Sequence, residues 1–404
     1  MECRAGRGAE SAGHGRQAGR VGSAVMRALV AMGAATAHHV RALEAYSTPL
    51  HGSAVHFALV ERPDTAFDEA GPAHAGDVLV RVHAFSCNYR EKGRLLQAAR
   101  RAEGGYLVLG SEFAGTVLKV GSAVEDLRPG DRVFGDGAVD ATLAHPGLST
   151  QRASQELQVL PRAKLMRFPA EMSFAQAAAF GVGAQTAYSM VRRLRPARGA
   201  HIAVTAATSN TSLFVIGALV ARGHTVHALT TSAAAVPQLR ALGVRDCCVL
   251  TRSEAADPLL QAYLAAQGIE KFDAVVDPFM DIYLRKLVRH LRRDGSYITC
   301  GVYQQFSEEA PDGFIDQGLP LAEVFSLIVR KNISLIGNNL GTTGDLAEAL
   351  ADHCAGRLPI PLDTVTGPDG LADFVQRTWL ASGRHGKVVF EYGPGGPANM
   401  GSEQ

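Results

Sequence analysis

The sequence predicts an α/β protein of two domains, one rich in short β-strands and one built on a doubly wound parallel sheet. Two patterns predict this. Before residue 196, short apolar runs are separated by glycines, which is typical of a small barrel. From His201 onward, short apolar runs alternate with segments of helical periodicity, as in a parallel sheet covered by helices. A length of 404 residues suits two domains.

The β-rich part is expected to span residues 43–195. Residues 43–62 contain Pro49 and Gly52 and predict a hairpin, and residues 77–84 alternate apolar and polar positions as a strand does. A loop and a short helix follow. Residues 110–136 are divided by glycines into short β runs. Residues 173–194 predict a long helix that is interrupted at residues 181–183.

The parallel-sheet domain is expected to span residues 196–336, and residues 337–392 to return to the first domain. The predicted strands are 202–204, 225–229, 247–250, 272–276, 296–300 and 333–336. The predicted helices are 213–221, 233–242, 258–267, 280–291 and 320–329, followed by a helix at 343–355 and a strand at 387–392. Residues 1–42 predict a disordered extension and residues 393–404 a disordered tail, because both are rich in small and polar residues.

Composition excludes several classes of partner. The formal net charge of +1 gives no reason to expect binding to nucleic acid or to an anionic membrane. No apolar run approaches 18 residues, so no membrane-spanning helix is expected. The six cysteines include no C-x-x-C pair, which favours reduced thiols and a cytoplasmic protein.

Residues 201–231 predict a strand, a turn, a helix and a second strand. Gly223 ends the helix. In such a unit the turn and the helix N-terminus form an anion site, because free N–H groups point at a bound phosphate. The usual G-x-G-x-x-G pattern is absent. The turn instead carries Thr208, Ser209, Asn210, Thr211 and Ser212. These residues are good helix caps, so a purely structural helix is the alternative to a phosphate site.

In order along the chain, five stretches resemble the medium-chain dehydrogenase/reductase superfamily over residues 43–392. They are VRVHAFSCNYREKG (80–93), GSEFAGTVLKVGSAVEDLRPGDRVFG (110–135), AAAFGVGAQTAY (177–188), FDAVVDPF with LRRDGSYITCG (272–301), and NISLIGNNLGTTGDLAEAL (332–350) leading to GRHGKVVFEY (383–392). The resemblance implies a GroES-like domain plus a Rossmann domain, and a homodimer formed through the Rossmann sheet.

Many members of this superfamily bind catalytic zinc. The positions that resemble their ligands hold Cys87, Ser111, Glu112 and Val182, so the His and the later Cys are lost. Zinc needs three protein ligands and an open position. We therefore expect no metal, and the chain resembles the zinc-free quinone oxidoreductase and enoyl (crotonyl-CoA) reductase branches.

The resemblance implies that Cys87, Asn88 and Tyr89 face the nicotinamide and the substrate. Asn88 or Tyr89 could hydrogen-bond a substrate carbonyl or donate a proton. The alternative is a loop whose polar groups satisfy their own backbone, with Cys87 as a small buried hydrophobe and Glu112 as a structural acid.

The remaining candidate residues concern the cofactor. An acid at the end of the second Rossmann strand would bind the ribose of NAD, but that position holds Thr230, Thr231 and Ser232, which favours NADPH. By the resemblance, the nicotinamide pocket is lined by Thr186, Gly301, Val302, Asn338 and Asn339.

These residues predict an NADPH-dependent, zinc-free oxidoreductase. It would transfer hydride to an activated C=C of an enone or enoyl thioester, or to a quinone. The alternative is a degenerate, non-catalytic member that binds a ligand or a partner, because side chains replace the glycines of the phosphate loop.

Overall fold

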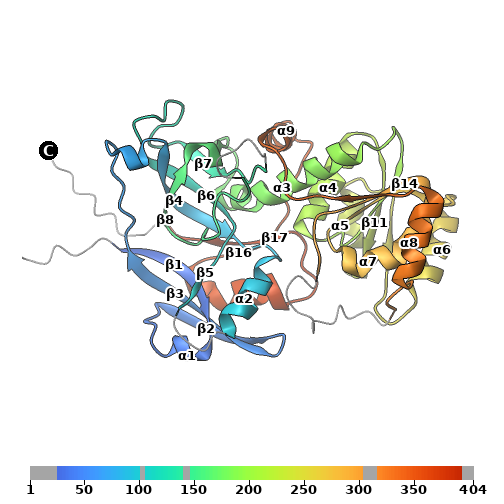
Figure 1. Cartoon of the computed structure of the whole chain (residues 1–404), viewed down its shortest axis with the longest axis horizontal. Coiled ribbons are helices and arrows are strands. Elements are labelled where there is room, and N and C mark those ends of the chain that lie inside the picture. Colours follow the sequence, from blue (N-terminus) through green and yellow to red (C-terminus); the bar gives the residue numbers. More distant parts are fainter. Residues whose placement is uncertain (1–24, 101–104, 140–145, 304–315, 394–404) are drawn as a thin grey trace, which may run out of the picture.

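A computed structural model describes residues 25–100, 105–139, 146–303 and 316–393. Its strands form three sheets, and the α/β fold of two domains is confirmed. A four-stranded and a seven-stranded sheet lie in one half, and a six-stranded parallel sheet lies in the other (Figure 1). Helix α3 runs between the two halves (Figure 1).

The four-stranded sheet has the order β2-β3-β1-β5. The seven-stranded sheet has the order β16-β17-β4-β6-β7-β9, with β8 paired to β4. The bounds of these strands are β1 Val25–Met32, β2 Glu44–Leu50, β3 Ser53–Pro63, β4 Asp77–Ser86, β5 Leu107–Val108, β6 Glu112–Val120, β7 Arg132–Gly135, β8 Leu157–Pro161, β9 Leu165–Arg167, β16 Leu362–Thr366 and β17 Lys387–Glu391.

The six-stranded sheet has the order β12-β11-β10-β13-β14-β15, and its pairs are parallel. Its strands are β10 His201–Val204, β11 Thr225–Thr230, β12 Asp246–Val249, β13 Phe272–Asp277, β14 Leu291–Thr299 and β15 Ser334–Gly337. The α-helices are α1 Ala34–Ala37, α2 Glu91–Ala99, α3 Phe174–Leu194, α4 Asn210–Ala221, α5 Val236–Ala241, α6 Ala256–Gln267, α7 Met280–Leu287, α8 Leu321–Lys331, α9 Thr343–Cys354 and α10 Leu371–Val375.

The expected disorder of residues 1–42 is wrong for residues 25–42. Strand β1 lies inside the four-stranded sheet, and Ala28, Leu29 and Val30 are fully buried. Because both faces of β1 are covered, its apolar residues do not alternate with polar ones, and the sequence pattern of a strand is lost. Residues 1–24 and 394–404, which carry the rest of the disorder predictions, lie outside the described residues.

The expected break in the helix at residues 181–183 is also wrong, because α3 is continuous from Phe174 to Leu194. Its glycines allow other elements to come close. A Cβ on Gly181 would lie 3.1 Å from the carbonyl oxygen of Gly135, and one on Gly183 would lie 2.5 Å from the side chain of Asn210. The glycines therefore serve packing rather than termination.

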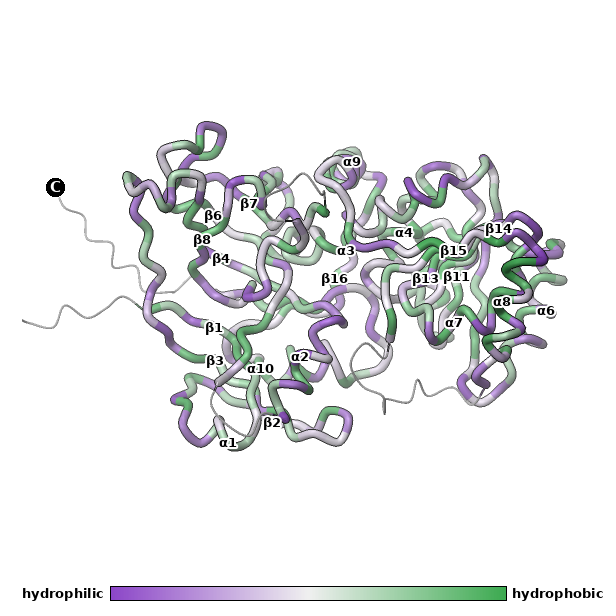
Figure 2. Tube along the Cα trace, viewed as in Figure 1, coloured by the Kyte–Doolittle hydropathy of each residue, from purple (hydrophilic) through white to green (hydrophobic). Residues whose placement is uncertain are grey.

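Helix α3 shares its hydrophobic core with both halves of the molecule. Phe134 and Phe180 pack together on the side of the seven-stranded sheet, and Phe180 packs edge-on against Phe214 of α4. The hydrophobic segments of the parallel-sheet half gather around its strands (Figure 2). This shared core holds the loops after β4, β10 and β13 near one another.

Candidate functional site

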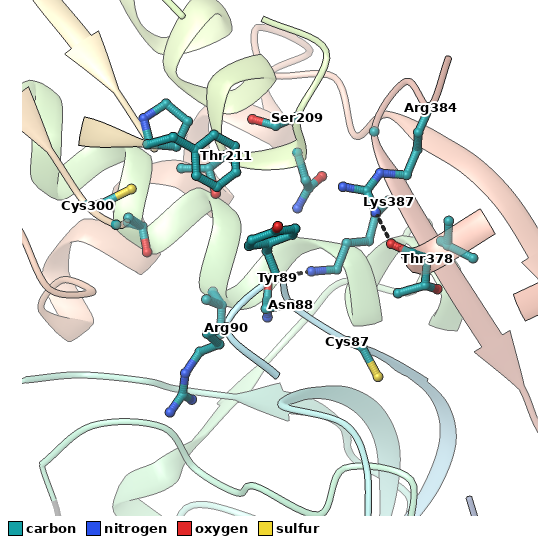
Figure 3. Close-up of a pocket in the computed structure, with 18 of the residues that line it drawn as sticks. Cys87, Asn88, Tyr89, Arg90, Ser209, Thr211, Cys300, Thr378, Arg384 and Lys387 are labelled. Carbon is teal, nitrogen blue, oxygen red and sulfur yellow. Dashed lines mark hydrogen bonds between the residues drawn. The ribbon is translucent and has the colours of Figure 1, made fainter. Parts of the chain in front are cut away.

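A cavity of about 320 Å³ lies where the two halves meet (Figure 3). Residues from both halves line it, and they come from the ends of strands and from helix N-termini. They are Cys87, Asn88, Tyr89 and Arg90 after β4; Val182 and Thr186 of α3; Ser209, Asn210 and Thr211 at the start of α4; Pro278, Phe279, Cys300 and Gly301 after β13 and β14; and Asn339, Leu340, Thr378, Arg384, Gly386, Lys387 and Val388.

A buried ion pair forms one wall of this cavity. The Nζ of Lys387 donates to Oδ1 of Asn88 at 2.7 Å (Figure 3). It also donates to Oε1 of Glu112 at 2.5 Å. The Nδ2 of Asn88 donates to the same Glu112 oxygen at 2.7 Å and to Oγ of Ser111 at 3.0 Å. The side chains of Lys387 and Glu112 are only 6% and 2% exposed. Hydrogen bonds to Lys387, Glu112 and Ser111 thus occupy the whole side-chain amide of Asn88.

The residues at the expected zinc positions do not fit a zinc ion. The second oxygen of Glu112 accepts from the N–H of Val182 at 2.9 Å, so both carboxylate oxygens are engaged. The hydroxyl of Ser111 donates to Glu91 at 2.6 Å. Burial raises the pKa of the Cys87 thiol, which disfavours the thiolate that zinc requires.

Tyr89 forms an aromatic cluster across the cleft. Its ring stacks on Tyr303 with centroids 5.0 Å apart and meets Phe279 edge-on at 5.3 Å. The Nζ of Lys92, in the first turn of α2, donates to Oη of Tyr89 at 2.8 Å. Burial raises the pKa of Tyr89, so its hydroxyl carries a proton at neutral pH.

The side chains at the former glycine positions turn back into the protein. Ser209 caps α4 by accepting from the N–H of Ser212, and Ser212 donates its hydroxyl to the carbonyl of Thr205 at 2.8 Å. The Nδ2 of Asn210 donates to the carbonyl of Ala179 at 3.0 Å. Thr211 faces the cavity, and its hydroxyl has no hydrogen-bond partner among the described residues. The cavity side of the loop therefore remains open to a ligand.

Comparison with known proteins agrees with this arrangement. The model of the alcohol dehydrogenase GroES-like domain matches residues 74–191. A putative quinone oxidoreductase of Bacillus subtilis, YhfP, is 29% identical over 56% of this chain and 65% of its own length. A trans-enoyl reductase of a Penicillium species, grgB, is 34% identical over 28% of this chain and 30% of its own. The chain thus spans less than two thirds of these curated relatives.

Solved structures share the fold over nearly the whole chain. A putative alcohol dehydrogenase of Sinorhizobium meliloti is 21% identical and superposes with a TM-score of 0.69, covering 92% of this chain and 99% of its own. A crotonyl-CoA carboxylase/reductase, AntE, in complex with NADP is 15% identical with a TM-score of 0.70, covering 91% and 95%. The predicted GroES-like and Rossmann architecture is confirmed.

The expected resemblance to the medium-chain dehydrogenase/reductase superfamily is supported by these matches. These relatives are oxidoreductases by name. Within the described residues, no helix is long and apolar enough to cross a lipid bilayer.

The fold brings most of the predicted site residues to one cavity. Those that line it are Cys87, Asn88, Tyr89, Thr186, Ser209, Asn210, Thr211, Gly301 and Asn339. Those outside its lining are Thr208, Ser212, Thr230, Thr231, Ser232, Val302 and Asn338. Thr230 is the last residue of β11, and Thr231 and Ser232 follow it. Asn338 is buried, and its Oδ1 accepts from the hydroxyl of Ser189 in α3 at 3.0 Å.

Sequence reasoning missed three cationic residues at or beside this site: Lys92, Arg384 and Lys387. Arg384 lines the cavity and donates to the carbonyl of Thr378 at 2.6 Å. Burial lowers the pKa of Arg384. Tyr89 and Lys92 are three residues apart at the start of a helix, and this spacing is a signal that could have identified Lys92. No local signal points to Lys387.

Proposed function

We propose that this protein is an NADPH-dependent, zinc-free reductase that transfers hydride to an activated C=C or to a quinone. One observation carries the proposal. A protonated tyrosine hydroxyl, Tyr89, and the N-terminus of α4 border the same cavity between the two domains. Hydride transfer to a carbonyl-activated alkene needs both a site for the dinucleotide and an acid for the resulting enolate.

The residues present fit a nicotinamide dinucleotide. The N-terminal turn of α4 presents free N–H groups to an anion, and Thr211 adds a hydroxyl. Arg384 faces the same space from the opposite domain (Figure 3). Thr186 and Gly301 line the deeper part expected for the nicotinamide ring. When bound, a reduced nicotinamide supplies the hydride.

We assign different roles to the residues after β4. We assign to Tyr89 the proton that the substrate receives, because Tyr89 lines the cavity and its raised pKa keeps its hydroxyl protonated. Asn88 orients the loop, because Glu112, Ser111 and Lys387 use all of its amide. Cys87 is 5% exposed and its raised pKa keeps it a thiol, so we assign it a packing role.

The preference for NADPH rests on the residues that end β11. Thr230 is buried, and its hydroxyl accepts from the N–H of Ser232 at 3.1 Å; neither residue nor Thr231 carries a negative charge. A carboxylate there would repel a 2′-phosphate. We expect tighter binding of NADPH than of NADH, and Thr231→Asp should shift the preference toward NADH.

We also propose a homodimer in the cytoplasm. The edge strand β15 and helix α8 expose large apolar side chains: Leu335 is 43% exposed, Phe325 58% and Val329 76%. A second copy pairing along β15 would cover them. The cysteines of the described residues are unpaired, which suits a reducing compartment.

The test has two stages. NADPH and NADH are titrated into the purified protein, and oxidation of NADPH is then followed with 2-cyclohexenone, crotonyl-CoA and 1,4-naphthoquinone as separate acceptors. We expect saturable NADPH binding and turnover with at least one of these acceptors. A folded protein that binds no NADPH at millimolar concentration contradicts the proposal. Elemental analysis that finds stoichiometric zinc contradicts its zinc-free part.

A further inference from the structure

We propose that Lys92 is a positioning residue that holds its ammonium on the hydroxyl oxygen of Tyr89, so that Tyr89 can protonate the reduced substrate and be reprotonated by Lys92. This inference rests on the proposed function and extends it to a residue outside the cavity lining. It follows from the hydrogen bond between Lys92 and Tyr89, which packing of the two side chains does not require.

The geometry makes Tyr89 an acceptor toward Lys92. The Nζ of Lys92 lies 2.8 Å from Oη of Tyr89, and it lies 5.1 Å and 4.9 Å from the ring centroids of Tyr89 and Tyr303. An ammonium has only donors, so the Tyr89 oxygen accepts from Lys92 and its own O–H donates elsewhere, within reach of the Tyr303 side chain with which it also hydrogen-bonds. Tyr89 lines the cavity, so that direction includes the substrate space.

Lys92 has no carboxylate partner among the described residues. Lys92 is 6% exposed, and within the part of the chain that the structure describes its ammonium donates only to Tyr89. A buried ammonium without a carboxylate is costly unless a negative charge appears beside it during the reaction. A tyrosinate formed at Tyr89 would be that charge, so the ammonium stabilises the product of proton transfer more than the starting state.

The surrounding groups set the pH at which this pair works. Burial lowers the pKa of Lys92 to about 8. His51, in the turn between β2 and β3, faces Lys92, and its own pKa is lowered by burial and by that ammonium. Asp281 of α7, Tyr303 after β14 and Arg384 before β17 face Tyr89. Above pH 8, Lys92 becomes a neutral amine and the support of a tyrosinate is lost.

The proton balance of the step is complete. The β-carbon of the enone accepts the hydride that a reduced nicotinamide supplies, and an enolate forms. The O–H bond of Tyr89 breaks and a C–H bond forms at the α-carbon. An N–H bond of Lys92 then breaks as the O–H bond of Tyr89 re-forms. The amine of Lys92 regains its proton from water.

The experiment compares Lys92→Met, Lys92→Arg, Tyr89→Phe and the double variant Lys92→Met/Tyr89→Phe with wild type. Lys119→Met, at an exposed ion pair with Glu69, is the matched control. With NADPH and 2-cyclohexenone, Tyr89→Phe should lower kcat about 10²- to 10⁴-fold. Lys92→Met should lower kcat about 10- to 150-fold, with KM changed by less than about threefold.

Three readouts separate a role in proton transfer from a structural one. The wild-type rate should fall as pH rises through 8, and Lys92→Arg should retain the rate and lose this fall, because a guanidinium stays charged. The double variant should be no slower than Tyr89→Phe, since the two residues act as a unit. Competitive acetylation without cofactor, read by mass spectrometry with Lys119 as internal reference, should place the Lys92 midpoint near pH 8.

The outcomes also separate this inference from the proposed function. If Tyr89→Phe is impaired while Lys92→Met turns over like wild type, the role of Lys92 is wrong and the reductase assignment stands. Additive effects of the two substitutions overturn the inference in the same way. If wild type binds NADPH but reduces no acceptor, both fail together. If Lys92→Met does not fold, the rate of Lys92→Arg and the pH profile of wild type decide whether Lys92 has this role.

Discussion

The Nζ of Lys387 lies 2.5 Å from Oε1 of Glu112, although 275 positions separate the two residues in the sequence. Glu112 begins β6, and Lys387 begins β17. Both strands pair with β4, so the ion pair joins the two neighbours of one central strand at the edge of the cavity. Asn88, which follows β4, completes the same network.

Lys387→Met should therefore destabilise the protein by about 3–5 kcal/mol, because it leaves the charge of Glu112 buried and unpaired. Chemical denaturation measures the change in the free energy of unfolding. The double variant Lys387→Met/Glu112→Gln should recover part of this loss. Lys119→Met, at an exposed pair with Glu69, should cost about 1 kcal/mol or less. Equal losses in the buried and the exposed variant would contradict the importance of the buried pair.

Thr211 and Ser209 should respond oppositely to replacement by Ala. The hydroxyl of Thr211 faces the cavity, so Thr211→Ala should weaken NADPH binding about 10- to 150-fold, as expected for a lost hydrogen bond to a charged group. The hydroxyl of Ser209 caps α4, so Ser209→Ala should cost about 1 kcal/mol of stability with a smaller change in affinity. Titration and thermal unfolding of both variants check this, and unchanged affinity in Thr211→Ala would place the pyrophosphate elsewhere.

Glycine should be more stable than the native alanine at position 206. The φ of Ala206 is +43°, in the left-handed region that alanine adopts at a cost, and this residue lies in the turn between β10 and α4. Ala206→Gly should raise the free energy of unfolding by about 1 kcal/mol. Its neighbour Ala207 is fully buried and has no positive φ, so Ala207→Gly should instead lower stability. A loss of stability in Ala206→Gly would disprove strain at this turn.

His227 should make the protein sensitive to acid. Burial lowers its pKa from 6.5 to about 4, so the folded state keeps it neutral and the unfolded state protonates it first. Its stabilising contribution is present above pH 6.5 and is lost as the pH falls toward 4, by about 3 kcal/mol in total. His227→Gln keeps polar groups for Tyr263 and His201, and its melting temperature should fall less between these pH values. An unchanged pH dependence would assign the acid sensitivity to other groups.

The apolar surface of α8 and β15 should control the oligomeric state. Leu335→Lys, on the edge strand, should convert the proposed dimer into a monomer, because it places a charge where two edges would pair. Sedimentation equilibrium measures the mass. Leu380 is similarly exposed, at 41%, but lies away from this edge, so Leu380→Lys should leave the dimer intact. A monomeric wild-type protein would contradict the dimer.

Local sequence patterns were sufficient to predict most strands and helices of the Rossmann half and the loop that carries Tyr89. Helices such as α9 have clear caps: Thr342 and Asp345 bond reciprocally at its start. Strand β1 could not be recognised, because it is buried on both faces and follows a segment of small and polar residues. The glycines of α3 predict a break on local grounds, because their packing role depends on Gly135 and Asn210, which lie far away in the sequence.

The contacts of the candidate site also fall into those that local sequence predicts and those that depend on the tertiary fold. Tyr89 and Lys92 are near in sequence, so their contact could have been predicted from helical spacing. Lys387 could not, since its partners Glu112 and Asn88 are joined to it only through the order of strands in a sheet. Likewise, the inward direction of Ser212 and Asn210 depends on hydrogen bonds to the carbonyls of Thr205 and Ala179, which no local pattern predicts.

The position of β17 in the chain has a consequence for biosynthesis. A ribosome synthesises β4, β6 and all of the Rossmann strands before Lys387, so the carboxylate of Glu112 has no Lys387 ammonium to pair with until then. The nascent polypeptide contains all strands of its parallel sheet once β15 is synthesised, whereas the Lys387 side of the cavity forms only after β17 is synthesised. Translation arrest before residue 387 would therefore yield an intact Rossmann half attached to an incomplete partner, a substrate for quality-control proteases.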